Sequence, residues 1–190
     1  MIKAIIFDCF GVLVGRGFDR TYRMAGGNPV KDRAFIENIL GQANLGLISD
    51  KEFQAAVAGQ IGLRTQEWQR VMQNAEQLNI PLLVYIKELH TSYKTAILSN
   101  ANAGVVNRLI GQRLLDETFD QVIISAEEGI VKPDIRIYQF TIDRLGVLAH
   151  ECLYVDDREV LLEPAERVGM QVLLYDDYTH TKEAIKKLLA

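Results

Sequence analysis

The chain has 190 residues, of which 48% are hydrophobic, and a formal net charge of -4. This length suits one domain or a domain with a modest insertion, and the apolar fraction is enough for a substantial core. The mildly acidic balance disfavours nucleic acid and an acidic membrane surface as partners, and no apolar run of the sequence reaches the length of a membrane-spanning helix. We therefore expect a soluble cytoplasmic protein, either a monomer or a homodimer, whose two cysteines, Cys9 and Cys152, are reduced core residues.

The first informative stretch is Ile5 to Val14, which reads Ile-Ile-Phe-Asp-Cys-Phe-Gly-Val-Leu-Val. Its apolar, β-branched and aromatic residues predict a buried strand that includes Cys9, and the glycine marks the break. Asp8 comes at the carboxyl end of this strand, where open α/β sheets place their sites. Phe10, two residues later, provides no second carboxylate.

The stretch from residue 15 to residue 80 has a different pattern from the rest of the chain. Its apolar residues recur only at helical spacing, around Phe35, Phe53 and Trp68. We expect an all-helical cap domain of residues 15–80, inserted into a core domain formed by residues 1–14 and 81–190. An insertion that leaves directly after Asp8 would lie over the strand ends, where it can exclude water and shape a substrate pocket.

The second half of the chain alternates strands with helices. The predicted strands are residues 95–99, 121–125, 153–155 and 171–175, and the predicted helices are residues 81–89, 102–114, 134–145, 159–168 and 179–189. This alternation indicates an α/β fold with a doubly wound parallel sheet that is covered by helices on both faces.

Polar residues cluster at the ends of four of these strands. They are Asp8, Ser99 with Asn100, Lys132, and Asp156 with Asp157. The carboxyl ends of parallel strands meet at one edge of a sheet, so the four clusters can converge. Taken singly, each also fits an ordinary turn or helix cap.

Together the four clusters have a chemical meaning. A carboxylate can attack phosphorus, hydroxyl and amide groups can hold phosphoryl oxygens, and a lysine can balance their charge. Adjacent carboxylates repel each other, and a hard cation such as Mg²⁺ is the simplest remedy.

Four motifs occur in order along the chain: Asp8-Cys9-Phe10-Gly11-Val12-Leu13, Ile97-Leu98-Ser99-Asn100, Gly129-Ile130-Val131-Lys132-Pro133-Asp134 and Val155-Asp156-Asp157. With these motifs the chain resembles the haloacid dehalogenase superfamily, in particular its phosphatase-like members with a helical cap of the C1 type. The resemblance covers essentially the whole chain. It implies a Rossmann-like three-layer core and a hydrolase that acts on a small phosphorylated molecule.

The resemblance also implies a metal site. Asp8 corresponds to the covalent nucleophile and a Mg²⁺ ligand, and the backbone carbonyl of Phe10 corresponds to a second ligand. Asp157 would bind the metal directly, and Asp156 would support it or bind it through water.

The remaining motif residues correspond to the phosphate site. Ser99 and Asn100 resemble the phosphate-binding pair, and Lys132 resembles the charge-balancing lysine. Arg16, just after the first motif, is our candidate for contacting an anionic substrate, although a solvent-exposed role is at least as good an interpretation.

Phe10 keeps two alternatives open. Phosphatases that resemble this chain usually have an aspartate there, which protonates the leaving group, whereas 2-haloacid dehalogenases have an aromatic residue and attack carbon without metal. The dehalogenases, however, typically have serine and asparagine in place of Asp156 and Asp157. The first alternative is therefore a dehalogenase-like enzyme, and the second is a weak or inactive protein that keeps the anion and metal sites.

Overall fold

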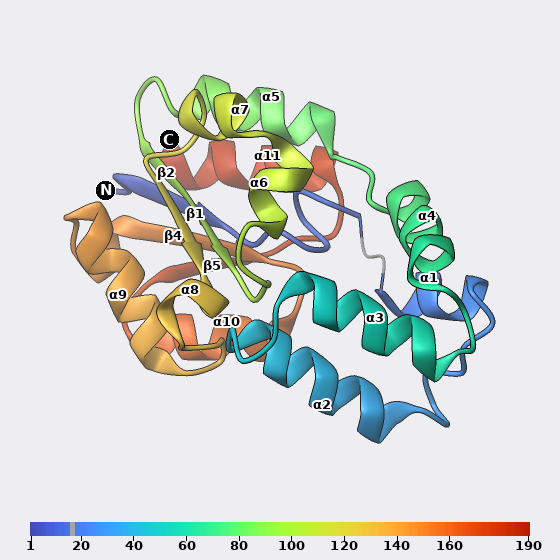
Figure 1. The fold of residues 1–190 in the computed structure, drawn as a ribbon. Coiled ribbons are helices and arrows are strands. Elements are labelled where there is room, and N and C mark those ends of the chain that lie inside the picture. The colour runs from blue at the N-terminus through green and yellow to red at the C-terminus, as the bar shows by residue number, and fades with distance from the viewer. Residues whose placement is uncertain (16–17) are drawn as a thin grey trace.

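A five-stranded parallel sheet forms the centre of the molecule, in the order β3-β2-β1-β4-β5 (Figure 1). The computed structural model describes residues 1–15 and 18–190. The strands are β1 (Ala4–Phe7), β2 (Lys94–Ser99), β3 (Gln121–Ile124), β4 (Cys152–Asp156) and β5 (Gln171–Leu174). The predicted α/β fold with a parallel sheet is confirmed.

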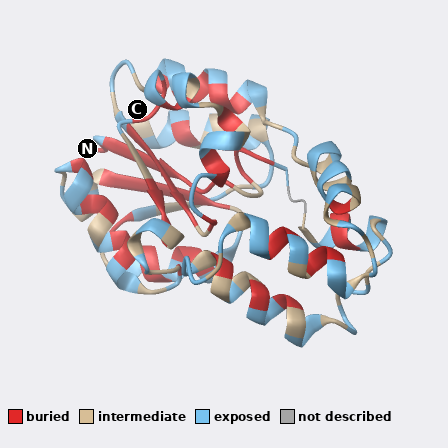
Figure 2. Cartoon of the chain, viewed as in Figure 1, coloured by how far each residue is buried: buried red, intermediate tan, exposed pale blue. Residues whose placement is uncertain are grey.

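Helices cover both faces of this sheet, so its central strands are buried (Figure 2). One face packs against α5 (Ile80–Leu89), α6 (Val105–Ile110), α7 (Gln112–Asp116) and α11 (Tyr178–Leu189), and the other against α9 (Ile135–Leu145) and α10 (Glu159–Arg167). Side chains alternate along a strand, so Ile5 and Phe7 of β1 enter the first layer and Ala4 and Ile6 the second. The sheet is therefore apolar on both sides, and polar side chains gather beyond its strand ends.

Four further helices lie beyond the carboxyl ends of the strands (Figure 1). They are α1 (Phe18–Met24), α2 (Arg33–Asn44), α3 (Asp50–Gln60) and α4 (Thr65–Ala75). Their apolar faces meet in a separate cluster that includes Tyr22, Ile36, Phe53, Val57 and Trp68. The helices predicted around Phe35, Phe53 and Trp68 are confirmed, whereas the domain boundaries at residues 15 and 80 stay a prediction. None of the helices in the described part of the chain is long and apolar enough to cross a membrane.

Two local predictions need correction. The strand β1 ends at Phe7, and Cys9 lies in the turn that follows, where its carbonyl accepts the N–H groups of Leu13 and Val14, both at 2.8 Å. The helix predicted for residues 102–114 is two helices, because Gly111 adopts a φ of 87° that no continuing helix allows. The description of both cysteines as buried and free of disulfides is confirmed.

Candidate active site

The turn after β1 fixes the position of Asp8. The Asp8 N–H donates to the Val155 carbonyl of β4 at 2.8 Å, which extends the sheet pairing by one residue. Gly11, with a φ of 101°, closes the turn and donates its N–H to the Val14 carbonyl at 2.6 Å. As a result the Asp8 side chain is buried beside the end of β4, and Phe10 is held half-buried two residues later.

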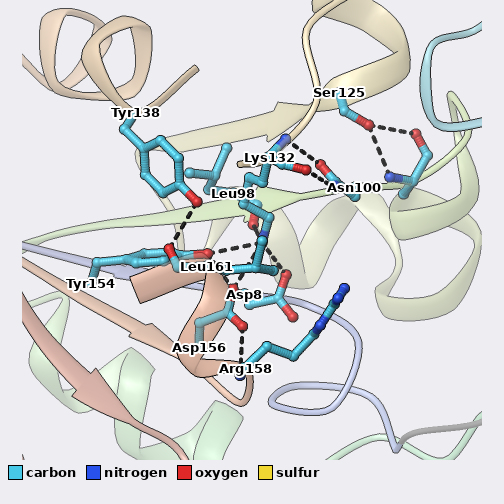
Figure 3. Close-up of polar contacts among 11 residues, drawn as sticks. Asp8, Leu98, Asn100, Ser125, Lys132, Tyr138, Tyr154, Asp156, Arg158 and Leu161 are labelled. Atoms are coloured by element: carbon cyan, nitrogen blue, oxygen red, sulfur yellow. Dashed lines mark hydrogen bonds and ion pairs between the residues drawn. The ribbon is translucent and has the colours of Figure 1, made fainter. Parts of the chain in front are cut away.

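Lys132 lies at the centre of the site (Figure 3). Its buried ammonium group donates to Asp8 Oδ1 at 2.6 Å and to Asp156 Oδ2 at 3.0 Å. The Leu98 carbonyl and the Tyr154 hydroxyl complete its surroundings, each at 2.9 Å. One lysine thus connects residues from the ends of β1, β2 and β4.

Asn100 holds the loop that carries Lys132. Its amide nitrogen donates to the Lys132 carbonyl at 2.8 Å, and its amide oxygen accepts the Lys132 N–H at 2.9 Å. Ser99, the preceding residue, is fully buried, and its hydroxyl has no hydrogen-bond partner among residues 1–15 and 18–190. The two residues of the predicted phosphate-binding pair therefore differ: the Asn100 amide bonds the Lys132 backbone, whereas the Ser99 hydroxyl bonds none of the described residues.

Three carboxylates meet at the ends of β1 and β4. Asp8, Asp156 and Asp157 can each present an oxygen within 4.8 Å of the others. Asp156 already accepts three hydrogen bonds, from Lys132, from the Tyr154 hydroxyl and from the Arg158 N–H at 3.0 Å. Carboxylate oxygens are the ligands that hard divalent cations prefer, so this donor set is one that such a cation fits.

Burial and mutual repulsion make the ionised form of Asp8 costly. Burial raises the pKa of Asp8 to about 6, Lys132 opposes this rise, and Asp156 adds to it. Burial by itself lowers the pKa of Lys132, but the Asp8 and Asp156 carboxylates outweigh it, so that the pKa of Lys132 is raised overall. Lys132 is thus held as a cation beside the two carboxylates.

Sequence reasoning missed Tyr154. Its hydroxyl accepts from Lys132 and donates to Asp156, and its ring packs edge-on against Tyr138 with the ring centroids 5.5 Å apart. Burial raises the pKa of Tyr154 well above its usual value. The available signal was the strand alternation, because Tyr154 is two residues before Asp156 and lies on the same face of β4.

A cavity of about 300 Å³ lies between the sheet ends and the helices α1 to α4. Its apolar lining comes from Phe10, Phe18, Leu40, Phe53, Met72 and Val105. Its polar lining includes Asp50, Glu76, Asn100, Arg108 and Arg158. Phe10 therefore faces a space that can hold a small molecule. Arg16, predicted to contact the substrate, lies outside the described residues.

Direct contacts join the helices α1 to α4 to the sheet layer beside the cavity. The Arg108 guanidinium of α6 pairs with both Glu76 oxygens after α4, at 2.9 and 3.0 Å. The buried Ser125 hydroxyl donates to the Asn44 carbonyl at the end of α2, at 2.7 Å, and accepts the Ala101 N–H at 3.1 Å. The helices α1 to α4 are thus tied to the sheet layer on two sides of the cavity.

Comparison with known proteins identifies the family. The family model for haloacid dehalogenase-like hydrolases matches residues 2–169. The chain belongs to this family. The superfamily membership that the four motifs predicted is thereby confirmed, and the chain is a member of a hydrolase family.

Individual relatives of this chain include both a phosphatase and a 2-haloacid dehalogenase. It is 25% identical over 186 residues to D-ribitol-5-phosphate phosphatase from Bacteroides thetaiotaomicron, covering 90% of each protein. It is 36% identical over 81 residues to (S)-2-haloacid dehalogenase 4A from Burkholderia cepacia, but this match covers 43% of the chain and only 35% of the dehalogenase.

The fold has a close match among solved structures. A haloacid dehalogenase family enzyme from Bacteroides thetaiotaomicron, solved with magnesium and inorganic phosphate, superposes with a TM-score of 0.78. The two chains are 20% identical, and the match covers 95% of this chain and 99% of that one. At this identity the similarity supports the shared fold.

Proposed function

We propose that this protein is a Mg²⁺-dependent phosphatase that acts on a small phosphorylated molecule through an aspartyl-phosphate at Asp8. The observation that carries the proposal is the arrangement around Lys132, whose ammonium group bonds both Asp8 and Asp156 beside a third carboxylate. A dehalogenase needs one carboxylate nucleophile, whereas three convergent carboxylates suit a metal-assisted attack on phosphorus. The match to a phosphatase over 90% of both chains supports the same conclusion.

Mg²⁺ suits the donor set at this edge of the sheet. Asp8, the Phe10 carbonyl and Asp157 would hold the ion, and Asp156 would support it, since both Asp156 oxygens already accept hydrogen bonds. When bound, the ion would offset negative charge on the phosphoryl oxygens. The related structure that was solved with magnesium supports this assignment.

The residues of the chain then have distinct tasks. An Asp8 oxygen attacks phosphorus, the bond from phosphorus to the leaving oxygen breaks, and the leaving group departs with the electron pair. Lys132 keeps Asp8 oriented and balances the charge, and the free Ser99 hydroxyl binds a phosphoryl oxygen. Water then attacks the phosphorus of the aspartyl-phosphate, which releases inorganic phosphate and restores the Asp8 carboxylate.

The cavity volume and the net charge bear on the size of the substrate and on the partners of the protein. A volume of about 300 Å³ limits the substrate to a small molecule, which binds in the space that Phe10 lines. We also propose a cytoplasmic location and no nucleic-acid or membrane partner, in line with the net charge of -4.

The test is hydrolysis of para-nitrophenyl phosphate by the metal-free protein and by the protein with added Mg²⁺. We expect activity that needs Mg²⁺ and is abolished in Asp8→Asn, which keeps the side-chain shape but removes the nucleophile. Lack of Mg²⁺-dependent hydrolysis, or equal activity in Asp8→Asn, would contradict the proposal.

A second candidate is 2-haloacid dehalogenation, in which an Asp8 oxygen attacks the halogen-bearing carbon and halide leaves. Two observations favour it: Phe10 lines a largely apolar cavity, and part of the chain matches a dehalogenase. Halide release from 2-chloropropionate without Mg²⁺ would support this candidate over the phosphatase. A protein inactive in both assays that still binds phosphate would instead be a binding protein.

A further inference from the structure

Arg158 is the residue whose position the proposed mechanism leaves unexplained. It follows Asp157 directly, and its own N–H donates to Asp156 Oδ1 at 3.0 Å, which fixes its backbone at the site. Its side chain lines the cavity, and Figure 3 draws it extended from the end of β4. The guanidinium group of Arg158 is therefore placed at the cavity by a backbone anchored to the site itself.

Among the residues that the structure describes, the charge of Arg158 also has no ion-pair partner. Among the described residues two arginines line the cavity, and Arg108 is neutralised by both oxygens of Glu76. Within residues 1–15 and 18–190, no carboxylate forms an ion pair with the Arg158 guanidinium. Arg158 thus offers a permanent positive charge and five N–H donors to whatever occupies the cavity.

Lys132 and Arg158 occupy different parts of the site, one buried and one at the cavity. Lys132 is buried against Asp8 and does not line the cavity, so its charge lies on the side of the nucleophile. In an in-line displacement the attacking and leaving oxygens are opposite each other. The leaving group needs space, which the cavity provides, and Arg158 lines that space together with Phe10.

We propose that Arg158 is a catalytic residue that hydrogen-bonds to the departing oxygen and stabilises its negative charge, a task that Phe10 cannot perform by proton transfer. This role rests on the proposed phosphatase function. As the bond from phosphorus to oxygen breaks, the electron pair moves to the leaving oxygen, and the guanidinium stabilises that charge without giving up its proton. The apolar walls of the cavity strengthen the interaction, because they keep the local dielectric low.

The test is a series of aryl phosphates whose leaving phenols differ in pKa, assayed with wild type, Arg158→Gln and Arg158→Lys. We expect Arg158→Gln to lose on the order of 10²-fold in kcat/KM for the most basic phenols. The loss should be much smaller for para-nitrophenyl phosphate, and Arg158→Lys should recover part of the activity. Arg167→Ala, an exposed arginine outside the cavity, is the matched control and should behave as wild type.

A second readout separates this role from simple phosphate binding. Inorganic phosphate has no leaving group, so inhibition by phosphate should be nearly the same in Arg158→Gln and wild type. An equal loss on every substrate, weaker inhibition by phosphate, or no loss at all would overturn the assignment. Wild-type protein inactive on all aryl phosphates would overturn the proposed function and this role with it. If wild type is active, and log kcat/KM falls with the pKa of the leaving phenol equally steeply in wild type and Arg158→Gln, only the role of Arg158 is overturned.

Discussion

At the scale of single residues, the pair Asp8 and Phe10 defines what is unusual about the site. Asp8 is buried and bonded to Lys132, as a nucleophile needs to be, but the residue two positions later has no titratable group. The Phe10 ring lines the cavity and packs on the core, so it helps to shape that cavity. In the proposed phosphatase reaction, the proton that the leaving group takes up would then come from the substrate or from water.

Phe10→Asp should raise the rate on substrates with poor leaving groups. General acid catalysis typically contributes ~10²–10⁴-fold, so a gain on a sugar phosphate is expected while para-nitrophenyl phosphate changes little. The measurement is kcat/KM on both substrates, with Phe10→Leu as a control that alters packing but adds no proton donor. Thermal unfolding of each variant checks that the turn after β1 still folds. A fast wild type on the sugar phosphate, with no gain in Phe10→Asp, would show that Phe10 does not limit turnover.

The missing acid should also slow the second half of the reaction. The residue that would protonate the leaving group would also activate water, so the aspartyl-phosphate should accumulate in wild type with a good leaving group. Rapid mixing with para-nitrophenyl phosphate should give a burst of nitrophenol of about one equivalent, and acid quenching should trap phosphate on the protein. Phe10→Asp should reduce the burst, and its persistence unchanged in that variant would contradict this explanation.

At the scale of elements, the site depends on how the loops after β2 and β3 are joined. The side chain of Asn100, after β2, bonds both backbone polar groups of Lys132, in the loop before α9. Lys132 then reaches back to Asp8, after β1. The position of the ammonium group is therefore set by contacts between loops that are distant in sequence.

Asn100→Ala should destabilise the ligand-free protein by ~1–3 kcal/mol, because it leaves the Lys132 N–H and carbonyl without partners. Activity should fall as well, since the ammonium group loses its fixed position. Denaturant unfolding without ligand measures the first effect. Asn107→Ala is the control: Asn107 is exposed and, among the described residues, its side chain bonds only Gln112, so a change within about 0.5 kcal/mol is expected. Unchanged stability in Asn100→Ala would show that Asn100 acts on the substrate alone.

At the scale of the whole molecule, the cavity lies between the helices α1 to α4 and the sheet layer, and one contact between these parts joins α2 to α8 (Ser125–Glu128). Gly46 approaches the Ala126 carbonyl so closely that an added Cβ would be 2.5 Å from its oxygen. The Ser125 hydroxyl bonds the Asn44 carbonyl next to this point. The fit between the two parts is therefore sterically demanding just after the end of α2.

Gly46→Ala should disrupt the contact between the end of α2 and α8, and Gly62→Ala provides a matched control. Both glycines have a φ of 72°, but an added Cβ at Gly62 meets nothing within 4 Å. The backbone strain of about 1–2 kcal/mol is shared by both variants, so a further loss of ~1–3 kcal/mol in Gly46→Ala would report the clash. We also expect kcat/KM on para-nitrophenyl phosphate to fall in Gly46→Ala alone. Equal stability and activity in the two variants would show that the contact at α2 does not set the cavity.

The sequence determined the fold class and the convergence of the site residues. Alternating strand and helix patterns indicate a parallel sheet, and the ends of parallel strands meet at one edge, so the sequence predicts that Asp8, Lys132 and Asp156 lie together, as they do. Local patterns carry this information because burial on a strand or helix depends on residues a few positions apart.

Only the tertiary structure decided which contacts each of these residues makes. Three features depend on contacts between distant loops: Asn100 bonds the Lys132 backbone, Tyr154 joins the network, and Arg158 has no carboxylate partner among the described residues. Such contacts leave no periodic pattern in the sequence, because side-chain direction and partner choice are set when the layers pack. Asp8 and Phe10 can be identified from the sequence, whereas the cavity that Phe10 lines forms only when the helices α1 to α4 pack over the strand ends.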